Sequence, residues 1–114
     1  MPVGITTHVL DTSRGKPAAG VPVTLAIQEG GDWREVGRAS TDADGRAKQL
    51  LPPDQPLEAG TWRLTFDLAA WFAAQGTEAF YPEASIVFRV RDAGQHYHVP
   101  LLLSPFGYST YRGS

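Results

Sequence analysis

Apolar and polar residues alternate with a period of two along most of the chain, which is the pattern of half-buried β-strands. The core-facing residues of the clearest segments are Ile5, Thr7 and Val9; Val21, Val23, Leu25 and Ile27; Trp62, Leu64 and Phe66; and Ile86, Phe88 and Val90. Turn-forming clusters separate these segments, including "DTSRGKPAAG", "QEGGD", "TDADG" and "LPPDQP". Short strands with turns at intervals of roughly 8–12 residues predict an all-β sandwich or barrel.

One segment departs from this period. In "DLAAWFAAQG", Asp67 is a candidate N-cap, the following residues tolerate a helix, and Gly76 is a candidate C-terminal stop. The segment therefore predicts a helix of about two turns within an otherwise all-β chain.

Length and composition narrow the possible classes of protein. The 114 residues suit a single domain, which we expect over residues 1–114. A net charge of −2 gives no basic surface for nucleic acid, and the absence of cysteine excludes disulfides and thiolate chemistry. No apolar stretch approaches the roughly 20 residues of a membrane-spanning helix. Because "MPVGITTHVLD" shows no signal-peptide pattern, we expect a cytoplasmic protein that does not contact the membrane.

Two of the three histidines lie in the apolar segment "HYHVPLLLSP". On a strand, His96 and His98 point away from the core-facing residues, which are Tyr97, Val99, Leu101 and Leu103. His8 repeats the arrangement, because its neighbours Thr7 and Val9 take the core face. Both segments are too apolar to lie open to water. The outward imidazoles of His8 and His98 therefore imply a second, partly covered surface, either a cleft or an interface with another copy of the chain.

Each histidine taken alone is also explained as a surface or interface residue with ordinary hydrogen bonds. His-x-His on a strand can begin a zinc site, but zinc needs a third protein ligand. Neither a cysteine nor a neighbouring acidic residue supplies it, and His8 would do so only through the fold. We therefore expect neither a metal nor a cofactor.

The segment "TDADGRA" predicts a hairpin turn, in which Asp42 can form an Asx turn. It lacks the ligands and the distal glutamate of an EF-hand calcium loop. Arg46 follows the turn directly, so it is either a solvated charge or an arginine held in place to bind an anion or a carbonyl. No serine–histidine–acid triad stands out, although Ser104, Ser109 and Ser114 supply hydroxyls.

Four segments together resemble the 5-hydroxyisourate hydrolases, the enzymatic branch of the transthyretin-like proteins: "THVLDTSRGKPAAGVPVTL", "TDADGR", "FYPE" and "HYHVPLLLSPFGYSTYRGS". The resemblance runs from Thr6 to Ser114, and the terminal "YRGS" separates the hydrolases from the hormone-carrying transthyretins. It implies a transthyretin-like sandwich of two four-stranded sheets with one short helix. It also implies a homotetramer, built as a dimer of dimers, whose central channel would be the covered surface.

The resemblance further implies a reaction and the residues that perform it. The family hydrolyses 5-hydroxyisourate, the unstable product of urate oxidation, to 2-oxo-4-hydroxy-4-carboxy-5-ureidoimidazoline. Its site maps onto His8, Arg46, His98 and Ser114, and Tyr111 would line the pocket. The two histidines would orient and deprotonate water, and the guanidinium would hold the substrate and stabilise the oxyanion. Ser114 would complete the hydrogen-bond network, and which histidine is the base is left open.

Two functions from other classes compete with hydrolysis. Transthyretins use the same channel to carry hormone-like ligands without chemistry, yet a carrier has no need of two histidines, an arginine and "YRGS" there. Structural prealbumin-like domains share the loose pattern "GxPxxGVxVxL…TDxDG", which this chain has from Gly15 to Gly45. Such domains normally sit beside other domains, and that function does not explain the terminal motif. We therefore expect a hydrolase.

Overall fold

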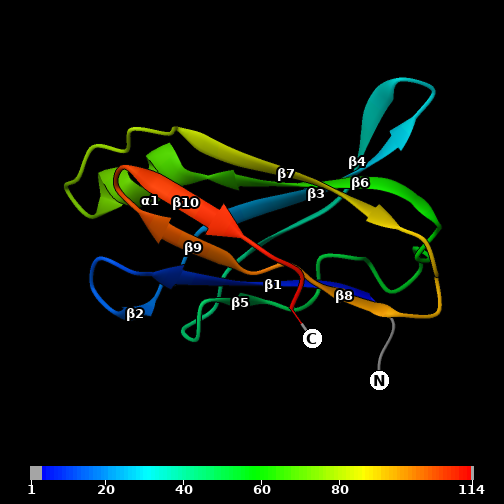
Figure 1. Cartoon of the computed structure of the whole chain (residues 1–114), viewed down its shortest axis with the longest axis horizontal. Coiled ribbons are helices and arrows are strands. Elements are labelled where there is room, and N and C mark those ends of the chain that lie inside the picture. The colour runs from blue at the N-terminus through cyan, green and yellow to red at the C-terminus, as the bar shows by residue number, and fades with distance from the viewer. Residues whose placement is uncertain (1–3, 114) are drawn as a thin grey trace.

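Two β-sheets pack face to face, and one short helix lies at an end of the sandwich (Figure 1). The computed structural model describes residues 4–113. The first sheet is antiparallel throughout and has the order β4–β3–β6–β7. Its strands are β3 (Pro22–Glu29), β4 (Asp32–Ser40), β6 (Gly60–Asp67) and β7 (Glu83–Val90).

The second sheet is built around β1 (Gly4–Asp11). Its other strands are β2 (Lys16–Pro17), β5 (Arg46–Ala47), β8 (His96–His98), β9 (Leu101–Ser104) and β10 (Gly107–Thr110). β2 and β5 run antiparallel to β1, β8 and β9 run parallel to it, and β10 pairs with β9. The all-β sandwich is confirmed. The four expected strands form the path β10–β9–β1–β2, but β5 and β8 also pair with β1 and bring this sheet to six.

The segment "HYHVPLLLSP" forms two strands, not one continuous strand. β8 ends at His98 and β9 begins at Leu101, and Val99 and Pro100 lie between them. Proline lacks an N–H group, so it cannot donate to the ladder at this position. Both residues are buried, and the alternation of faces predicted for this segment persists across the break, because Tyr97, Val99, Leu101 and Leu103 are all buried.

The predicted helix is confirmed as α1 (Leu68–Ala74). The carboxylate of Asp67 accepts a hydrogen bond from the backbone N–H of Ala70 at 3.0 Å, which is the expected N-cap. Gly76 follows the helix with a φ of 70°, a conformation that glycine adopts without steric cost. Trp71 and Phe72 bury one face of α1 against the sandwich, so tertiary packing supports a helix too short to be stable alone.

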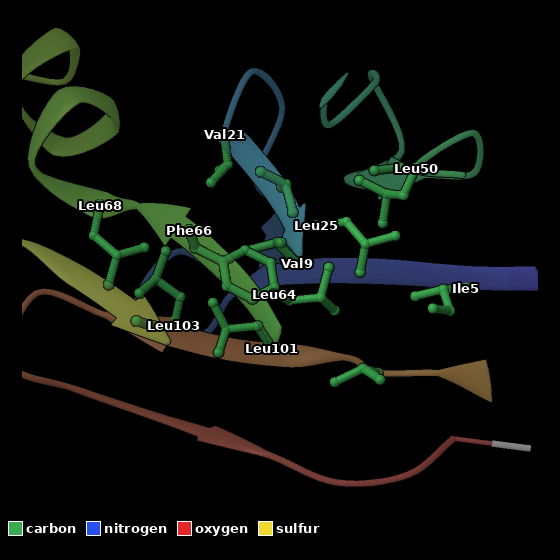
Figure 2. Close-up of a cluster of buried hydrophobic side chains, with 14 of the residues drawn as sticks. Ile5, Val9, Val21, Leu25, Leu50, Leu64, Phe66, Leu68, Leu101 and Leu103 are labelled. Atoms are coloured by element: carbon green, nitrogen blue, oxygen red, sulfur yellow. The ribbon is translucent and has the colours of Figure 1, made fainter. Parts of the chain in front are cut away.

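The core lies between the two sheets and consists of the alternate residues that the sequence predicts (Figure 2). Val9 and Leu101 from the second sheet meet Leu25, Leu64 and Phe66 from the first, and all five are fully buried. Burying a side chain of this size contributes about 1.5–3 kcal/mol. The sandwich therefore rests on its inner faces and leaves the outward face of β1 available for polar residues.

The turn "TDADG" does not close a hairpin, contrary to the sequence prediction. It joins β4 of the first sheet to β5, which pairs with β1 of the second sheet. The reason is the backbone hydrogen bond from the N–H of Val9 to the carbonyl of Gly45, 2.7 Å long, which draws the chain across the sandwich. Within residues 4–113, no helix has the length and apolarity needed to cross a membrane.

Candidate active site

Cross-strand pairing with β1 brings three predicted site residues to one face. His8 lies opposite Arg46 of β5, and Thr6 lies opposite His98 of β8. Residues opposite each other on neighbouring strands have Cβ atoms about 5 Å apart on the same side of the sheet. Thr6 and His8 also share a face of β1, since they are two positions apart. His8, Arg46 and His98 therefore gather on the outward face of the second sheet.

The turn before β5 fixes the position of Arg46. The carboxylate of Asp42 accepts hydrogen bonds from the backbone N–H groups of Arg46 at 3.0 Å and of Asp44 at 2.9 Å, which confirms the Asx turn. The bond from the Arg46 amide is the main cause that lowers the pKa of Asp42. In the described part of the chain no carboxylate forms an ion pair with Arg46, so its exposed guanidinium is available to an incoming ligand.

Gly45 is required in this turn for two reasons. Its φ is +76°, which favours glycine, and a Cβ added there would lie 2.4 Å from the carbonyl oxygen of Val9. The turn consequently packs directly on the backbone of β1. This close approach sets the register that places Arg46 beside His8.

One ring nitrogen of His98 is held by Thr6, which also contacts His96. Nδ1 of His98 lies 2.8 Å from Oγ1 of Thr6, and the same hydroxyl lies 2.9 Å from Nε2 of His96. Burial lowers the pKa of His98, and the neighbouring charges of Arg46, His8 and His96 lower it further. A half-buried imidazole in this environment stays neutral near pH 7.

The end of the chain covers His98. The backbone N–H of Gly113 donates to the carbonyl of His98 at 2.8 Å, and the described chain ends beside β8 (Figure 1). The hydroxyl of Thr110 donates to the carbonyl of Pro100 at 2.7 Å, and the guanidinium of Arg112 lies 4.6 Å from the ring centroid of Tyr97. The partly covered surface that the sequence implies is thus covered in part by the chain's own tail.

The structure does not bring every predicted site residue to this cluster. Tyr111 lines a separate cavity of about 230 Å³, and neither His8, Arg46 nor His98 lines it. The other residues of that cavity are Ile86, Phe88, Arg89, Tyr97, Val99, Thr110 and Arg112. Ser114 lies outside the described residues. No group of three or more His, Cys, Asp or Glu side chains among residues 4–113 could hold a metal ion, and the expected independence from metal stays a prediction.

Sequence reasoning missed Thr6 and Gly113, which contact His98 directly. Thr6 looked like an ordinary strand residue, because its role depends on the pairing of β1 with a segment about ninety positions away. In the sequence, Gly113 stands out only as part of the terminal motif "YRGS". The usable signal for it was a glycine directly before the final residue of a strand-like tail.

Comparison with known proteins identifies the family. The sequence model of the HIUase/Transthyretin family matches residues 5–113. The chain belongs to this family. Among members of the HIUase/Transthyretin family, a probable 5-hydroxyisourate hydrolase of Caenorhabditis elegans is 49% identical over 110 residues, covering 96% of this chain and 81% of that protein.

Solved structures from both branches of the HIUase/Transthyretin family resemble this one. The 5-hydroxyisourate hydrolase of Klebsiella pneumoniae has a TM-score of 0.83 and 42% sequence identity, covering 96% of this chain and 98% of that chain. The transthyretin of Sparus aurata has a TM-score of 0.91 and 32% identity, covering 98% of this chain and 97% of that chain. Since the backbone superimposes well on both, the fold alone does not separate the two branches, and the side chains of the site must do so.

Proposed function

We propose that this protein hydrolyses 5-hydroxyisourate to 2-oxo-4-hydroxy-4-carboxy-5-ureidoimidazoline in the degradation of urate. The observation that carries the proposal is the convergence of His8, Arg46 and His98 on one face of the second sheet. Proteins named as hydrolases of this substrate are 41–49% identical to this chain over nearly its whole length, which supports the same activity here.

The proposed reaction opens a ring by water attack. The oxygen of water bonds to a ring carbonyl carbon and loses a proton to a histidine, and the carbonyl oxygen becomes an oxyanion. The C–N bond then breaks, the leaving nitrogen takes up a proton, and the former carbonyl becomes a carboxylate. Histidine suits the base because its pKa lies near neutrality. The planar guanidinium of Arg46 suits the oxyanion and the electron-rich ring, since it offers several N–H donors in one plane.

The carrier function is disfavoured by the chemistry of the face. A pocket that only carries a ligand is mostly apolar, with few polar groups to fix orientation. Here two imidazoles and an arginine without an ion-pair partner among residues 4–113 lie together. Covering these polar groups with a ligand costs desolvation free energy, and in a carrier no catalysis would compensate for it.

We also propose a homotetramer, built as a dimer of dimers. Large apolar side chains are exposed along the edge strands β7 and β10 and the loops beside them: Phe80, Tyr81, Val87, Phe106, Tyr108 and Tyr111. Unpaired sheet edges that carry exposed aromatic residues are surfaces that proteins normally cover. In the proposed assembly two dimers enclose the face that bears His8 and His98, Tyr111 lines the resulting pocket and Ser114 completes its polar network. The cytoplasmic location stays a prediction of the sequence.

The decisive assay follows the ultraviolet absorbance of freshly generated 5-hydroxyisourate, corrected for its spontaneous decay, with wild-type protein, His8→Ala and His98→Ala. Each substitution should lower kcat by about 10²–10⁴-fold, the usual worth of a positioned acid–base group or of a donor to the oxyanion. Circular dichroism should show that both variants fold, because neither side chain belongs to the core. Wild-type protein that leaves the decay rate unchanged would refute the proposed function.

The assay should give the same rate in EDTA as in untreated buffer. Hydrolysis in the proposed mechanism uses only side chains and water. Activity that disappears in EDTA and returns with zinc would show that the site needs a metal. Sedimentation of the same samples tests the tetramer, and a monomer at assay concentration would contradict it.

A further inference from the structure

The hydroxyl of Thr6 connects two imidazoles and can donate to only one of them. Its Oγ1 lies 2.9 Å from Nε2 of His96 and 2.8 Å from Nδ1 of His98. A hydroxyl has one hydrogen to donate and two lone pairs to accept with. If Thr6 accepted from both rings, its own hydrogen would have no acceptor among residues 4–113. The chain of hydrogen bonds therefore runs in one direction, either from His96 through Thr6 to His98 or the reverse.

The second ring nitrogen of His96 determines the direction of the hydrogen bonds through Thr6. Its Nδ1 is buried and has no hydrogen-bond partner among residues 4–113. A buried N–H without an acceptor is rare and destabilising, whereas an unpaired lone pair is tolerated more often. If Thr6 donated to His96, the neutral ring of His96 would have to carry its proton on this buried Nδ1. The opposite direction avoids that cost, because the proton of His96 then sits on Nε2 and is donated to Thr6.

This direction fixes the tautomer of His98. Thr6, having accepted from His96, donates its own hydrogen to Nδ1 of His98. A neutral imidazole with an accepting Nδ1 carries its proton on Nε2. Nε2 is the nitrogen that remains for a substrate, because Nδ1 is engaged by Thr6. In this state the ring donates a hydrogen bond and cannot accept a proton from water at Nε2.

We propose that Thr6 and His96 are positioning residues that hold His98 as a neutral Nε2–H donor, so that His8 is the general base. The proposal rests on the proposed function and deepens it by dividing the two histidine roles. His8 takes the proton of the attacking water as the C–O bond forms, and returns it to the leaving nitrogen as the C–N bond breaks. His98 transfers no proton. Its Nε2–H, with Arg46, donates to the developing oxyanion.

The environment of His98 agrees with this assignment. Desolvation and the neighbouring groups Arg46, His8 and His96 lower its pKa, which favours the neutral ring. Arg46 comes from β5, His8 from β1 and His96 from β8, so the groups that lower this pKa come from three strands. A neutral imidazole that serves as a donor next to a cationic guanidinium avoids placing two positive charges together.

The test reads the tautomer directly. Long-range ¹H–¹⁵N correlation spectra of protein labelled with ¹⁵N-histidine distinguish a protonated from an unprotonated ring nitrogen. We expect Nε2–H tautomers for both His96 and His98 at neutral pH. Protonation of Nδ1 of His98 would overturn the proposal. Because this readout needs no turnover, it still decides the tautomer of His98 if wild-type protein fails to hydrolyse 5-hydroxyisourate. That failure would refute the proposed function and the role of His8 as base, and would leave the positioning of His98 by Thr6 and His96 standing.

Variants of Thr6 connect the tautomer to catalysis. Thr6→Val keeps the β-branched shape and removes the hydroxyl, so the spectrum of His98 should shift to a mixture of tautomers and kcat should fall about tenfold, the worth of one hydrogen bond. Thr6→Ser should restore both. Thr24→Val is the matched control, because Thr24 is a half-buried threonine on β3 of the other sheet. Equal spectra and equal kcat for wild-type protein and Thr6→Val would overturn the proposal.

Discussion

Gly113 packs so closely on the imidazole of His98 that any side chain added there would clash with the ring. The two residues are joined by a hydrogen bond of 2.8 Å from the N–H of Gly113 to the carbonyl of His98. A Cβ added at Gly113 would lie 2.6 Å from Cδ2 of His98 and 3.4 Å from Cγ of Pro100. The missing side chain is therefore what lets the tail lie flat on the ring.

Gly113→Ala should lower kcat more than it lowers stability. The new methyl group must displace either the tail or the ring of His98, and misplacing a reacting group by about 1 Å can cost 10²-fold in rate. Turnover and thermal melting of the same sample test this. Gly107→Ala is the control, since its added Cβ would meet only Oγ of Ser104, at 3.9 Å. If Gly113→Ala kept wild-type kcat, the contact with His98 would have no catalytic meaning.

Deletion of residues 111–114 should abolish most turnover and leave a folded sandwich. The deletion removes the cover of His98 and the contact of Arg112 with Tyr97, but no residue of the core cluster. The two lost hydrogen bonds, from Gly113 to His98 and from exposed Arg112 to Gln95, and the cation–π contact correspond together to about 1–3 kcal/mol of stability. Urea unfolding, sedimentation and the absorbance assay should be run together. A truncated protein that is tetrameric and fully active would show that the tail is dispensable.

Arg46→Lys should lower kcat/KM about 10–10³-fold although the charge is kept. An ammonium is a point charge and cannot reproduce the planar set of donors that a guanidinium offers to an oxyanion. The backbone of the turn should be unaffected, because Asp42 contacts the amide of residue 46 and not its side chain. Arg38→Lys on β4 serves as the control for the substitution itself. Equal kcat/KM for Arg46→Lys and wild-type protein would remove Arg46 from the proposed site.

The free energy of unfolding should decrease as the pH falls below 6.5, because His98 takes up a proton less readily in the folded protein. Its folded-state pKa lies below the usual value of 6.5, first because of burial and then because of Arg46, His8 and His96. The unfolded chain therefore binds this proton more readily. The free energy of unfolding should be highest above the unfolded pKa and should fall from pH 6.5 down to the lowered folded pKa. Urea titrations of wild-type protein and His98→Gln over this range should differ in slope, and parallel curves would contradict the assignment.

The pattern of the sequence predicts the faces of the strands because burial imposes a strict period of two. The outward direction of His8 and His98 follows from the apolar residues beside them, without knowledge of which strands pair. The N-cap at Asp67 was likewise predictable, since capping depends on contacts within a few residues. The alternation of apolar and polar residues therefore predicts which side chains are buried, and neighbouring residues predict the helix cap.

The pairing of strands was not predictable in the same way. β5 has only two residues, too few to show any alternation, and its position depends on the packing of Gly45 against β1. The contact of Thr6 with His98 depends on a parallel register between segments that are far apart in sequence. Such registers are set by the whole packed sheet and not by either strand. This is why the hairpin prediction for "TDADG" was wrong and why Thr6 went unnoticed.

Because β1 and β8 pair in parallel, enzymatic turnover reports whether these two strands, which are far apart in the sequence, have come together. Thr6 and His98 are 92 positions apart, so their contact forms only when β1 and β8 have met. Closing so long a loop is slow compared with forming a hairpin such as β3–β4. A single cut at the exposed Pro53–Asp54 bond would leave two fragments, neither of which holds a whole site. Activity regained on mixing the two fragments would measure how completely β1 pairs with β8 again.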